Sequence, residues 1–277
     1  MTPASAQPNP LTERRTTRRV AVVRAASSGR IAAGRAFSMV ELLVVLAVVV
    51  LLMSLLMPAI SSVKENARRI VCSSNLRQIG FATAQYAGDN DGHLPAAVVL
   101  EDASLGGPQE LMSSHRGVKA GQWDGLGLLF KRGYCEQPAC FYCPSHHGNH
   151  PYERYANDWW DRADLANSNQ PVDGPIYMNY HYGGDRSWNP SNIARRRLYD
   201  TKKGSQLVIA TDGLRSVGDF NHDVGLNVLR SDGAVSWFNS GPKVRSYLPT
   251  IDENGLTVSG EEDYAGLWNV IEELANQ

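Results

Sequence analysis

Residues 37–60 read FSMVELLVVLAVVVLLMSLLMPAI, and this stretch decides the fold. From Leu42 to Ile60 the chain runs for 19 residues without a charge, interrupted only by Ser54 and Pro58. As an α-helix this run would span about 28 Å, close to the hydrocarbon thickness of a bilayer. A helix in the core of a soluble domain normally carries a polar stripe, and this run has none. The sequence therefore predicts a membrane-spanning helix.

The flanking residues indicate that the apolar span is kept as a membrane anchor, and they also indicate its orientation. A secretory signal has a shorter apolar region and a small-x-small cleavage site on its far side, whereas this chain continues past Ser61 as an amphipathic segment. Residues 1–36 hold seven arginines and one acid, a formal charge of +6, against −7 for the remainder. A basic arm ahead of an apolar span favours membrane targeting over nucleic-acid binding. We expect a single-pass inner-membrane protein with a cytoplasmic N-terminus and an exported head, residues 93–277.

Glu41 is out of place in this apolar run. A carboxylate near the edge of the bilayer core costs on the order of 2–3 kcal/mol, so such a residue usually has a partner or a function. The alternative interpretation is that Glu41 lies among the lipid headgroups as a simple boundary residue.

The surrounding octet GRAFSMVE, residues 34–41, resembles the processing site of type IV prepilins. The resemblance implies that a prepilin peptidase cuts between Ala36 and Phe37, methylates the new amine of Phe37, and leaves Glu41 as the fifth residue of the mature chain. One position departs from the family, because Ala36 stands where glycine is usual. Alanine is the next smallest residue, so we expect processing to persist.

The resemblance also implies an assembly role for Glu41. Cleavage leaves a positive amine on Phe37 within the membrane, and Glu41 of a neighbouring subunit would neutralise it, which favours one register between subunits. The implied partners are the prepilin peptidase, sister subunits and membrane lipid. The implied product is a pilin-like filament or a type II secretion pseudopilus, and the sequence does not choose between them.

The helix is predicted to continue through residues 61–92, loosened near Pro58. Apolar residues recur at spacings of three or four and stop at the turn GDNDG, residues 88–92. They are Val63, Ala67, Ile70, Leu76, Ile79, Thr83 and Tyr86. Residues 72–95 resemble the prepilin-like proteins of planctomycete-type bacteria. The implied fold is α+β and pilin-like: a long N-terminal transmembrane helix packed on a small antiparallel sheet, with loop-rich insertions.

Order returns near the end of the head. Residues 206–212 predict a buried strand, and residues 222–238 predict a hairpin that turns at Asp232-Gly233. His222 precedes Asp232 by nine intervening residues, which resembles the H-X9-DG signature of the same prepilin-like family. His222 either braces the hairpin by hydrogen bonds or belongs to a site for a partner or metal. A last helix is predicted over residues 260–275.

Three cysteines and three histidines cluster in the head: Cys135, Cys140, Cys143, His146, His147 and His150. An oxidising exterior favours a disulfide among the three cysteines. The same spacing suits a structural zinc site that uses the histidines as well, and unpaired thiols are the third alternative. Cys72 is expected to pack in the core.

A calcium site is a further possibility at Asp89, Asn90 and Asp91, whose side chains offer oxygen ligands. The stretch lacks the full pattern of an EF-hand loop. Turn chemistry that ends the helix is the competing interpretation.

Enzyme motifs are absent: the sequence contains no G-x-S-x-G, no phosphate-binding glycine loop and no H-E-x-x-H. We therefore expect a structural subunit and not an enzyme, with no cofactor beyond structural zinc or calcium. Two alternatives stay open. A metal-dependent hydrolase would use His146, His147, His150, Asp212, His222 and Asp232. An anchored binding module would present the aromatic residues Trp159, Trp160, Tyr177, Tyr180, Tyr182 and Trp188.

Overall fold

The computed structural model describes residues 37–97, 112–165, 169–183, 197–198, 207–222, 224–239, 241–248, 250–251, 257–259 and 264–275. The predicted leader 1–36, with Ala36, and residue Trp188 lie outside these ranges. The chain divides into two compact units, residues 1–53 and 54–277.

Helix α1, Met39–Asp89, is the longest element, with 51 residues, and it continues through Pro58. Its start is a capping box. The Val40 backbone N–H donates to Ser38 Oγ (3.3 Å), and the Ser38 backbone N–H donates to the Glu41 carboxylate (2.9 Å). Its end is the predicted turn, where Gly92 has a φ of 79° and donates to Ala87 O (2.8 Å).

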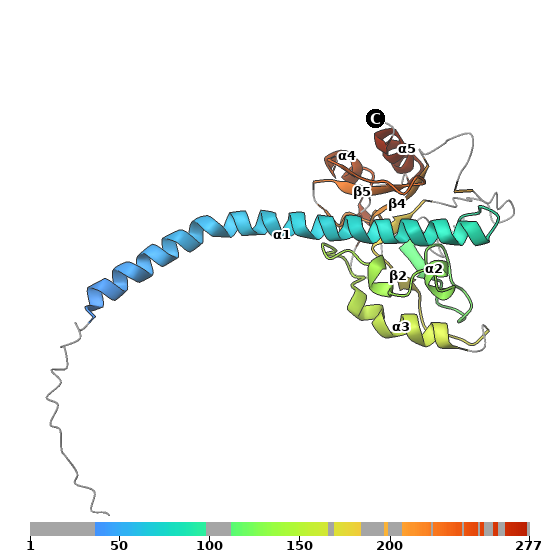
Figure 1. Cartoon of the computed structure of the whole chain (residues 1–277), viewed down its shortest axis with the longest axis horizontal. Helices are drawn as coiled ribbons and strands as arrows, with labels where there is room; N and C mark the ends of the chain where they lie inside the picture. Colours follow the sequence, from blue (N-terminus) through green and yellow to red (C-terminus); the bar gives the residue numbers. More distant parts are fainter. Residues whose placement is uncertain are drawn as a thin grey trace, which may run out of the picture. The chain divides into compact units, whose positions relative to one another are not determined.

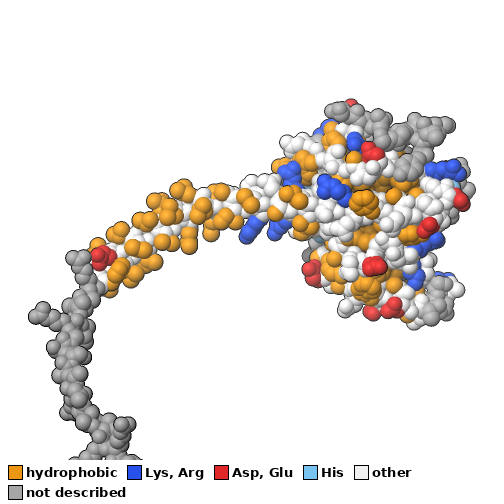
Figure 2. Space-filling model, in the orientation of Figure 1, with side chains coloured by type: hydrophobic (Ala, Val, Ile, Leu, Met, Phe, Trp, Pro, Cys, Tyr) orange, Lys and Arg blue, Asp and Glu red, His pale blue; other side chains and the backbone are white. Residues whose placement is uncertain are grey.

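Every side chain of residues 37–60 is exposed, and apolar side chains cover this part of α1 (Figure 2). Among the described residues, α1 is the one helix long and apolar enough to cross a membrane. This agrees with the predicted single-pass membrane protein. A soluble core helix would instead have buried much of this surface.

From Cys72 onward, α1 buries one face, formed by Cys72, Leu76, Ile79, Ala82, Thr83, Tyr86 and Ala87. The predicted stripe is therefore confirmed for its later members. It is wrong for Val63, Ala67 and Ile70, which are exposed. The periodicity slips near Ser73, so the earlier residues project from a different face of the helix than the one that the head covers.

The main sheet is antiparallel, with the order β3-β4-β5-β6. Its strands are β3 (Tyr180–Tyr182), β4 (Val208–Asp212), β5 (Leu226–Arg230) and β6 (Val235–Phe238). The β5–β6 hairpin turns where predicted, because Gly233 adopts a φ of 81° and its N–H donates to Arg230 O (2.9 Å).

The remaining elements are short. Two further antiparallel pairs join β1 (Ser113–His115) to β2 (Ile176–Tyr177) and β7 (Thr250–Ile251) to β8 (Thr257–Ser259). The helices are α2 (Gly127–Lys131), the 3₁₀ turn η2 (Pro138–Phe141), α3 (Tyr152–Asp164), α4 (Gly241–Arg245) and α5 (Tyr264–Ala275). Residues 260–263 of the predicted last helix are not among those described.

The head part of α1 packs on one face of the main sheet, and α5 packs on the other. Leu229 of β5 joins the core with α1, whereas Leu226 and Val228 join the core with Trp268 of α5. Gly80 permits this close approach, because a Cβ there would lie 2.9 Å from Leu229 Cδ1. In Figure 1, α2, α3 and β2 lie on the opposite side of α1 from β4, β5 and α5. The predicted α+β class is thus confirmed.

Adjacent tryptophans on α3 offer a matched test of this core. Trp159 is fully buried and stacks on Phe141 with ring centroids 5.2 Å apart, whereas Trp160 is 45% exposed. Trp159→Ala should lower the free energy of unfolding by about 3–5 kcal/mol, because it opens a large cavity. Trp160→Ala should lower the free energy of unfolding much less. Urea unfolding of the detergent-solubilised full chain measures both, and equal losses would contradict this description of the core.

Candidate functional site

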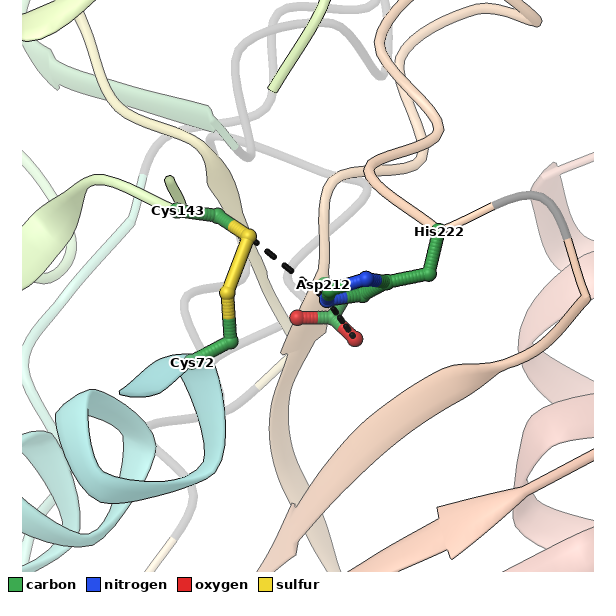
Figure 3. A group of neighbouring side chains, drawn as sticks. All are labelled: Cys72, Cys143, Asp212 and His222. Atoms are coloured by element: carbon green, nitrogen blue, oxygen red, sulfur yellow. Dashed lines mark hydrogen bonds and ion pairs between the residues drawn. A yellow bond between two sulfur atoms is a disulfide. The ribbon is translucent and has the colours of Figure 1, made fainter. Parts of the chain in front are cut away.

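A buried polar cluster joins α1 to the main sheet around His222. We call Glu65, Cys72, Cys143, Asp212 and His222 the His222 cluster. His222 Nδ1 lies 2.6 Å from Glu65 Oε1, and Nε2 lies 3.7 Å from Asp212 Oδ2. The imidazole is fully buried, whereas the Glu65 side chain is 37% exposed. His222 is therefore held between two carboxylates, Glu65 on α1 and Asp212 on the main sheet. Figure 3 shows the other four members of the cluster without Glu65.

The secondary structure positions each member. Glu65 and Cys72 lie two turns apart on α1, so they share one face of the helix. Asp212 ends β4 and accepts hydrogen bonds at Oδ2 from the backbone and side-chain amides of Asn227 on β5. His222 belongs to the loop that leads into β5.

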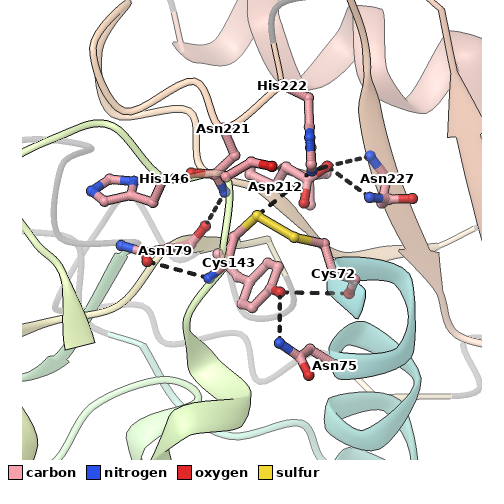
Figure 4. Close-up of polar contacts among 12 residues, drawn as sticks. Cys72, Asn75, Cys143, His146, Asn179, Asp212, Asn221, His222 and Asn227 are labelled. Atoms are coloured by element: carbon pink, nitrogen blue, oxygen red, sulfur yellow. Dashed lines mark hydrogen bonds and ion pairs between the residues drawn. A yellow bond between two sulfur atoms is a disulfide. The ribbon is translucent and has the colours of Figure 1, made fainter. Parts of the chain in front are cut away.

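Asparagine side chains hold the loops that carry the other members (Figure 4). The Cys143 N–H donates to Asn179 Oδ1 (3.3 Å), and Asn221 Nδ2 donates to Asn179 O (2.7 Å). On α1, Asn75 Nδ2 donates to Tyr142 O (3.0 Å). These contacts bring the loop after η2 and the loop before β5 to the same point on α1.

Asp212 has an unusual electrostatic environment. Burial raises its pKa to about 6, against the opposing influence of His222, the Asn227 hydrogen bonds and Arg69. Its second oxygen, Oδ1, is buried and has no hydrogen-bond partner among the described residues. A buried carboxylate oxygen without a partner is costly, which marks this position as a candidate for ligand binding.

A disulfide joins Cys72 of α1 to Cys143, with the Cα atoms 5.3 Å apart. The predicted pairing among Cys135, Cys140 and Cys143 is thereby corrected, since the partner of Cys143 is Cys72. The two residues are 71 positions apart in the chain, so only the packing of α1 on the head brings them together. Closing a loop of this length stabilises the fold by about 4 kcal/mol in the chain-entropy model.

Cys135 and Cys140 are free thiols in the structure, with their sulfur atoms 2.7 Å apart. The contact with Cys140 lowers the pKa of the Cys135 thiol, and the same contact together with burial raises the pKa of the Cys140 thiol. Cys135 and Cys140 are thus the two members of the predicted disulfide group with which Cys143 does not pair.

The histidines of the predicted zinc site have separate partners. His146 Nδ1 lies 3.0 Å from Asn221 Oδ1, His150 Nδ1 lies 2.7 Å from Tyr155 Oη, and His147 is exposed. Burial, with a smaller effect of Arg215, lowers the pKa of His150 to about 3. Among the described residues, the group of potential metal ligands that does come together is Cys72, Cys143, Asp212 and His222. The predicted ligand set therefore shares only Cys143 with the observed group.

The H-X9-DG residues do not form one site. His222 precedes β5, whereas Asp232 and Gly233 follow it and make the hairpin turn. Asp232 accepts a hydrogen bond from the Ala234 N–H (2.9 Å) and lies 3.5 Å from Arg230. The spacing of nine residues is the length of strand β5 with its flanking turns.

The candidate calcium ligands are engaged by protein groups. Asp89 accepts a hydrogen bond from Tyr134 Oη (2.9 Å), and Asn90 Oδ1 accepts one from Arg132 (3.1 Å). Asp91 adopts a φ of 55° in the turn that ends α1. These contacts support the interpretation as turn chemistry.

Most of the candidate binding aromatics belong to the core. Trp159, Tyr180 and Tyr182 are fully buried, and Tyr177 is half-buried. Of the aromatic residues named from the sequence, Trp160 is the one with an exposed ring in the described part of the chain. The aromatic residues that the structure describes therefore do not form an exposed platform for sugar or peptide binding.

A cavity of about 620 Å³ adjoins the His222 cluster. Cys143, His146 and Asn179 contribute to its lining, but Asp212 and His222 do not. The proposed hydrolase residues are therefore divided, with His146 at the cavity, Asp212 and His222 buried beside it, and Asp232 on the hairpin.

Comparison with known proteins finds one family. Residues 61–129 match the model of a family described as "Protein of unknown function (DUF1559)". The matched residues run from the head part of α1 through α2. No curated protein and no solved structure matches the chain.

Sequence reasoning missed Glu65 and the role of Cys72. Their spacing of seven residues on a predicted helix was the available signal, since it places both on one face. The sequence indicates Asp212 only as one member of the alternative metal-dependent hydrolase set, because nothing local distinguishes it from other residues that end a strand.

The raised pKa of Asp212 predicts a pH dependence of stability. The folded protein holds a proton on Asp212 up to about pH 6, whereas the usual value for the carboxyl is 3.8. The stability from this proton is present below about pH 4 and is lost as the pH rises through 6. Over this range wild type should lose about 3 kcal/mol relative to Asp212→Asn, which cannot ionise. Urea unfolding from pH 4 to 7, with chelator and without reductant, measures the difference.

The exposed hairpin residue Asp232 provides the control. Asp232→Asn should follow the wild-type pH dependence. A constant difference between wild type and Asp212→Asn across this range would contradict the assignment.

Proposed function

We propose that this chain is a structural subunit, a prepilin or pseudopilin. A prepilin peptidase would process it between Ala36 and Phe37, and the mature chain would join sister subunits in a type IV pilus-like filament or type II secretion pseudopilus. The observation that carries the proposal is the exposed apolar part of α1, residues 37–60, with Glu41 in its first turn.

The exposed apolar surface needs a cover of lipid or of other helices. Within the bilayer, association of such helices comes from close packing and not from the hydrophobic effect, so it is reversible enough for assembly. The apolar surface also continues into the head part of α1, where Ile70 is 69% and Phe81 is 71% exposed. A neighbouring subunit packed along α1 would bury both.

Glu41 is available for a second role besides capping. In the unprocessed chain its carboxylate accepts the hydrogen bond from the Ser38 N–H. Cleavage would create an ammonium group at Phe37, beside the N-terminus of α1. A carboxylate from a sister subunit would then balance a charge that the bilayer does not solvate, in keeping with the cost of unpaired charge there.

The attachment of α1 to the head suits a load-bearing subunit. The disulfide at Cys72 and the contact between Glu65 and His222 tie the helix to two separate loops of the head. Force applied to the helix of such a subunit would be transmitted to the head through a covalent bond.

The processing step is tested by the N-terminal sequence and intact mass of the protein from native membranes. We expect a mature chain that begins at methylated Phe37. Ala36→Gly should be processed at least as well, because it restores the usual residue, and Ala36→Leu should block cleavage. A chain that retains Arg35 and Ala36 would contradict the proposal and indicate a simple signal anchor.

Replacement of Glu41 separates its charge from its capping role. Glu41→Gln keeps a hydrogen-bond acceptor for the Ser38 N–H but removes the charge. We expect normal cleavage and about a tenfold or greater loss of cross-linked sister subunits, which corresponds to one ion pair worth at least 1.4 kcal/mol. Glu41→Ala should reduce the yield of cross-linked sister subunits at least as much as Glu41→Gln does.

Ser38→Ala is the matched control, because it removes the hydroxyl cap and leaves the charge. It should assemble nearly as wild type does. Normal assembly of Glu41→Gln would sink the charge-pairing account, and failure of Ser38→Ala would show that the hydroxyl cap of Val40 is itself needed for assembly.

A further inference from the structure

We propose that the reduced chain binds one zinc ion through Cys72, Cys143, Asp212 and His222. Reduction of the disulfide would thus exchange one cross-link between α1 and the head for another. This inference does not depend on the assembly function proposed above.

The ligand atoms lie close enough together to share one metal ion once the disulfide is reduced and the two sulfur atoms separate. One ligand atom from each of the four residues lies within 4.8 Å of every other (Figure 3). Zinc bonds of about 2.0–2.3 Å place tetrahedral ligands about 3.3–3.8 Å apart. His222 Nε2 lies 3.6 Å from Cys143 Sγ, so one edge of the tetrahedron already exists, and it lies 3.7 Å from Oδ2 of the Asp212 carboxylate.

Glu65 orients the histidine for metal binding. Its carboxylate lies 2.6 Å from His222 Nδ1 and can only accept, so Nδ1 carries the proton. The lone pair of Nε2 then faces Cys143 and Asp212. A carboxylate behind a ligating histidine is the usual outer contact of zinc sites, where it sets the tautomer and the ring orientation.

The buried carboxylate of Asp212 is a second and independent indication that a ligand binds here. It is completely buried, Asn227 holds its Oδ2 atom, and its Oδ1 atom has no hydrogen-bond partner in the described part of the chain. A metal ion would engage this carboxylate and satisfy its charge. The four ligands are 0–4% exposed, which is typical of a structural site closed to solvent.

The redox step balances with a dithiol reductant. Two electrons and two protons from the dithiol convert the Cys72–Cys143 disulfide to two thiols, and the dithiol becomes a disulfide. Zinc binding then releases the two thiol protons and leaves two thiolates and one carboxylate around a divalent cation. The Arg69 guanidinium, which lies over Trp237 and lowers the pKa of Asp212, offsets the excess negative charge.

The adjoining cavity offers a route to the sulfur atoms. The cavity of about 620 Å³ reaches Cys143 between Tyr142 and His146. A small dithiol and a hydrated cation both fit a space of this size. Cys143 is thus the sulfur that the reductant would attack first.

The experiment uses the full chain in detergent, reduced with dithiothreitol and freed of it by anaerobic gel filtration. Co²⁺ is the spectroscopic probe, because tetrahedral cobalt with thiolate ligands gives visible d–d and near-ultraviolet charge-transfer bands. We expect saturation at one Co²⁺ per chain, displacement by Zn²⁺, and no bands for the oxidised protein. Absence of stoichiometric bands in the reduced wild type would overturn the proposal.

Variants identify which residues bind. The double change Cys72→Ser with Cys143→Ser should abolish the bands, and the matched double change Cys135→Ser with Cys140→Ser should retain them. The opposite pattern would place the metal at Cys135 and Cys140 and overturn the assignment.

Asp212→Asn and His222→Gln keep all four cysteines and should weaken Zn²⁺ binding at least tenfold. Glu65→Gln should weaken it by about 10-fold to 100-fold through loss of the outer contact. The melting temperature of each oxidised variant reports whether it folds. Unchanged Zn²⁺ affinity in folded Asp212→Asn and His222→Gln would exclude the proposed ligand set.

Discussion

The packing of α1 on the main sheet is the interaction on which the head depends. Its buried face begins at Cys72 and continues through Tyr86, and the aromatic and aliphatic side chains of β3, β4 and β5 fill the space against it. Gly80 brings the helix close to β5. The main sheet has only four strands, and its other face needs α5 as a cover. Neither sheet face would be shielded from water without these helices, and sheets of this size are not stable alone.

The same contact creates the His222 cluster. Once α1 lies on the sheet, Glu65 and Cys72 meet residues from three other parts of the chain: the loop after η2, the end of β4 and the loop before β5. Polar and sulfur groups placed at such a junction act as cross-links, because each contact joins segments that are distant in sequence. That role fits the structural subunit proposed above, and a buried histidine between two carboxylates does not by itself require hydrolase chemistry.

Two carboxylates of α1, one at its start and one midway along it, have opposite environments. At its start, Glu41 is exposed, and its carboxylate accepts the Ser38 N–H. In the head, Glu65 is partly exposed but reaches a fully buried imidazole. In the described part of the chain the first carboxylate has only a backbone donor, so its charge is available to a partner outside the chain, whereas the second already pairs with His222 inside it. This difference connects the proposed assembly role to residues 37–60 and the proposed metal chemistry to the head.

The sequence by itself determined the long helix, its apolar first part, the turn through Gly92 that follows it, and the β5–β6 hairpin. Each follows from local rules, namely a run without charge, a periodicity of three to four, and glycine at positive φ. It did not determine the cysteine pairing, the partners of His222 or the burial of Trp159. Cys72 and Cys143 are 71 residues apart, and Glu65 and His222 are 157 apart. Such contacts depend on which face of α1 meets the sheet, and only the tertiary structure decides that.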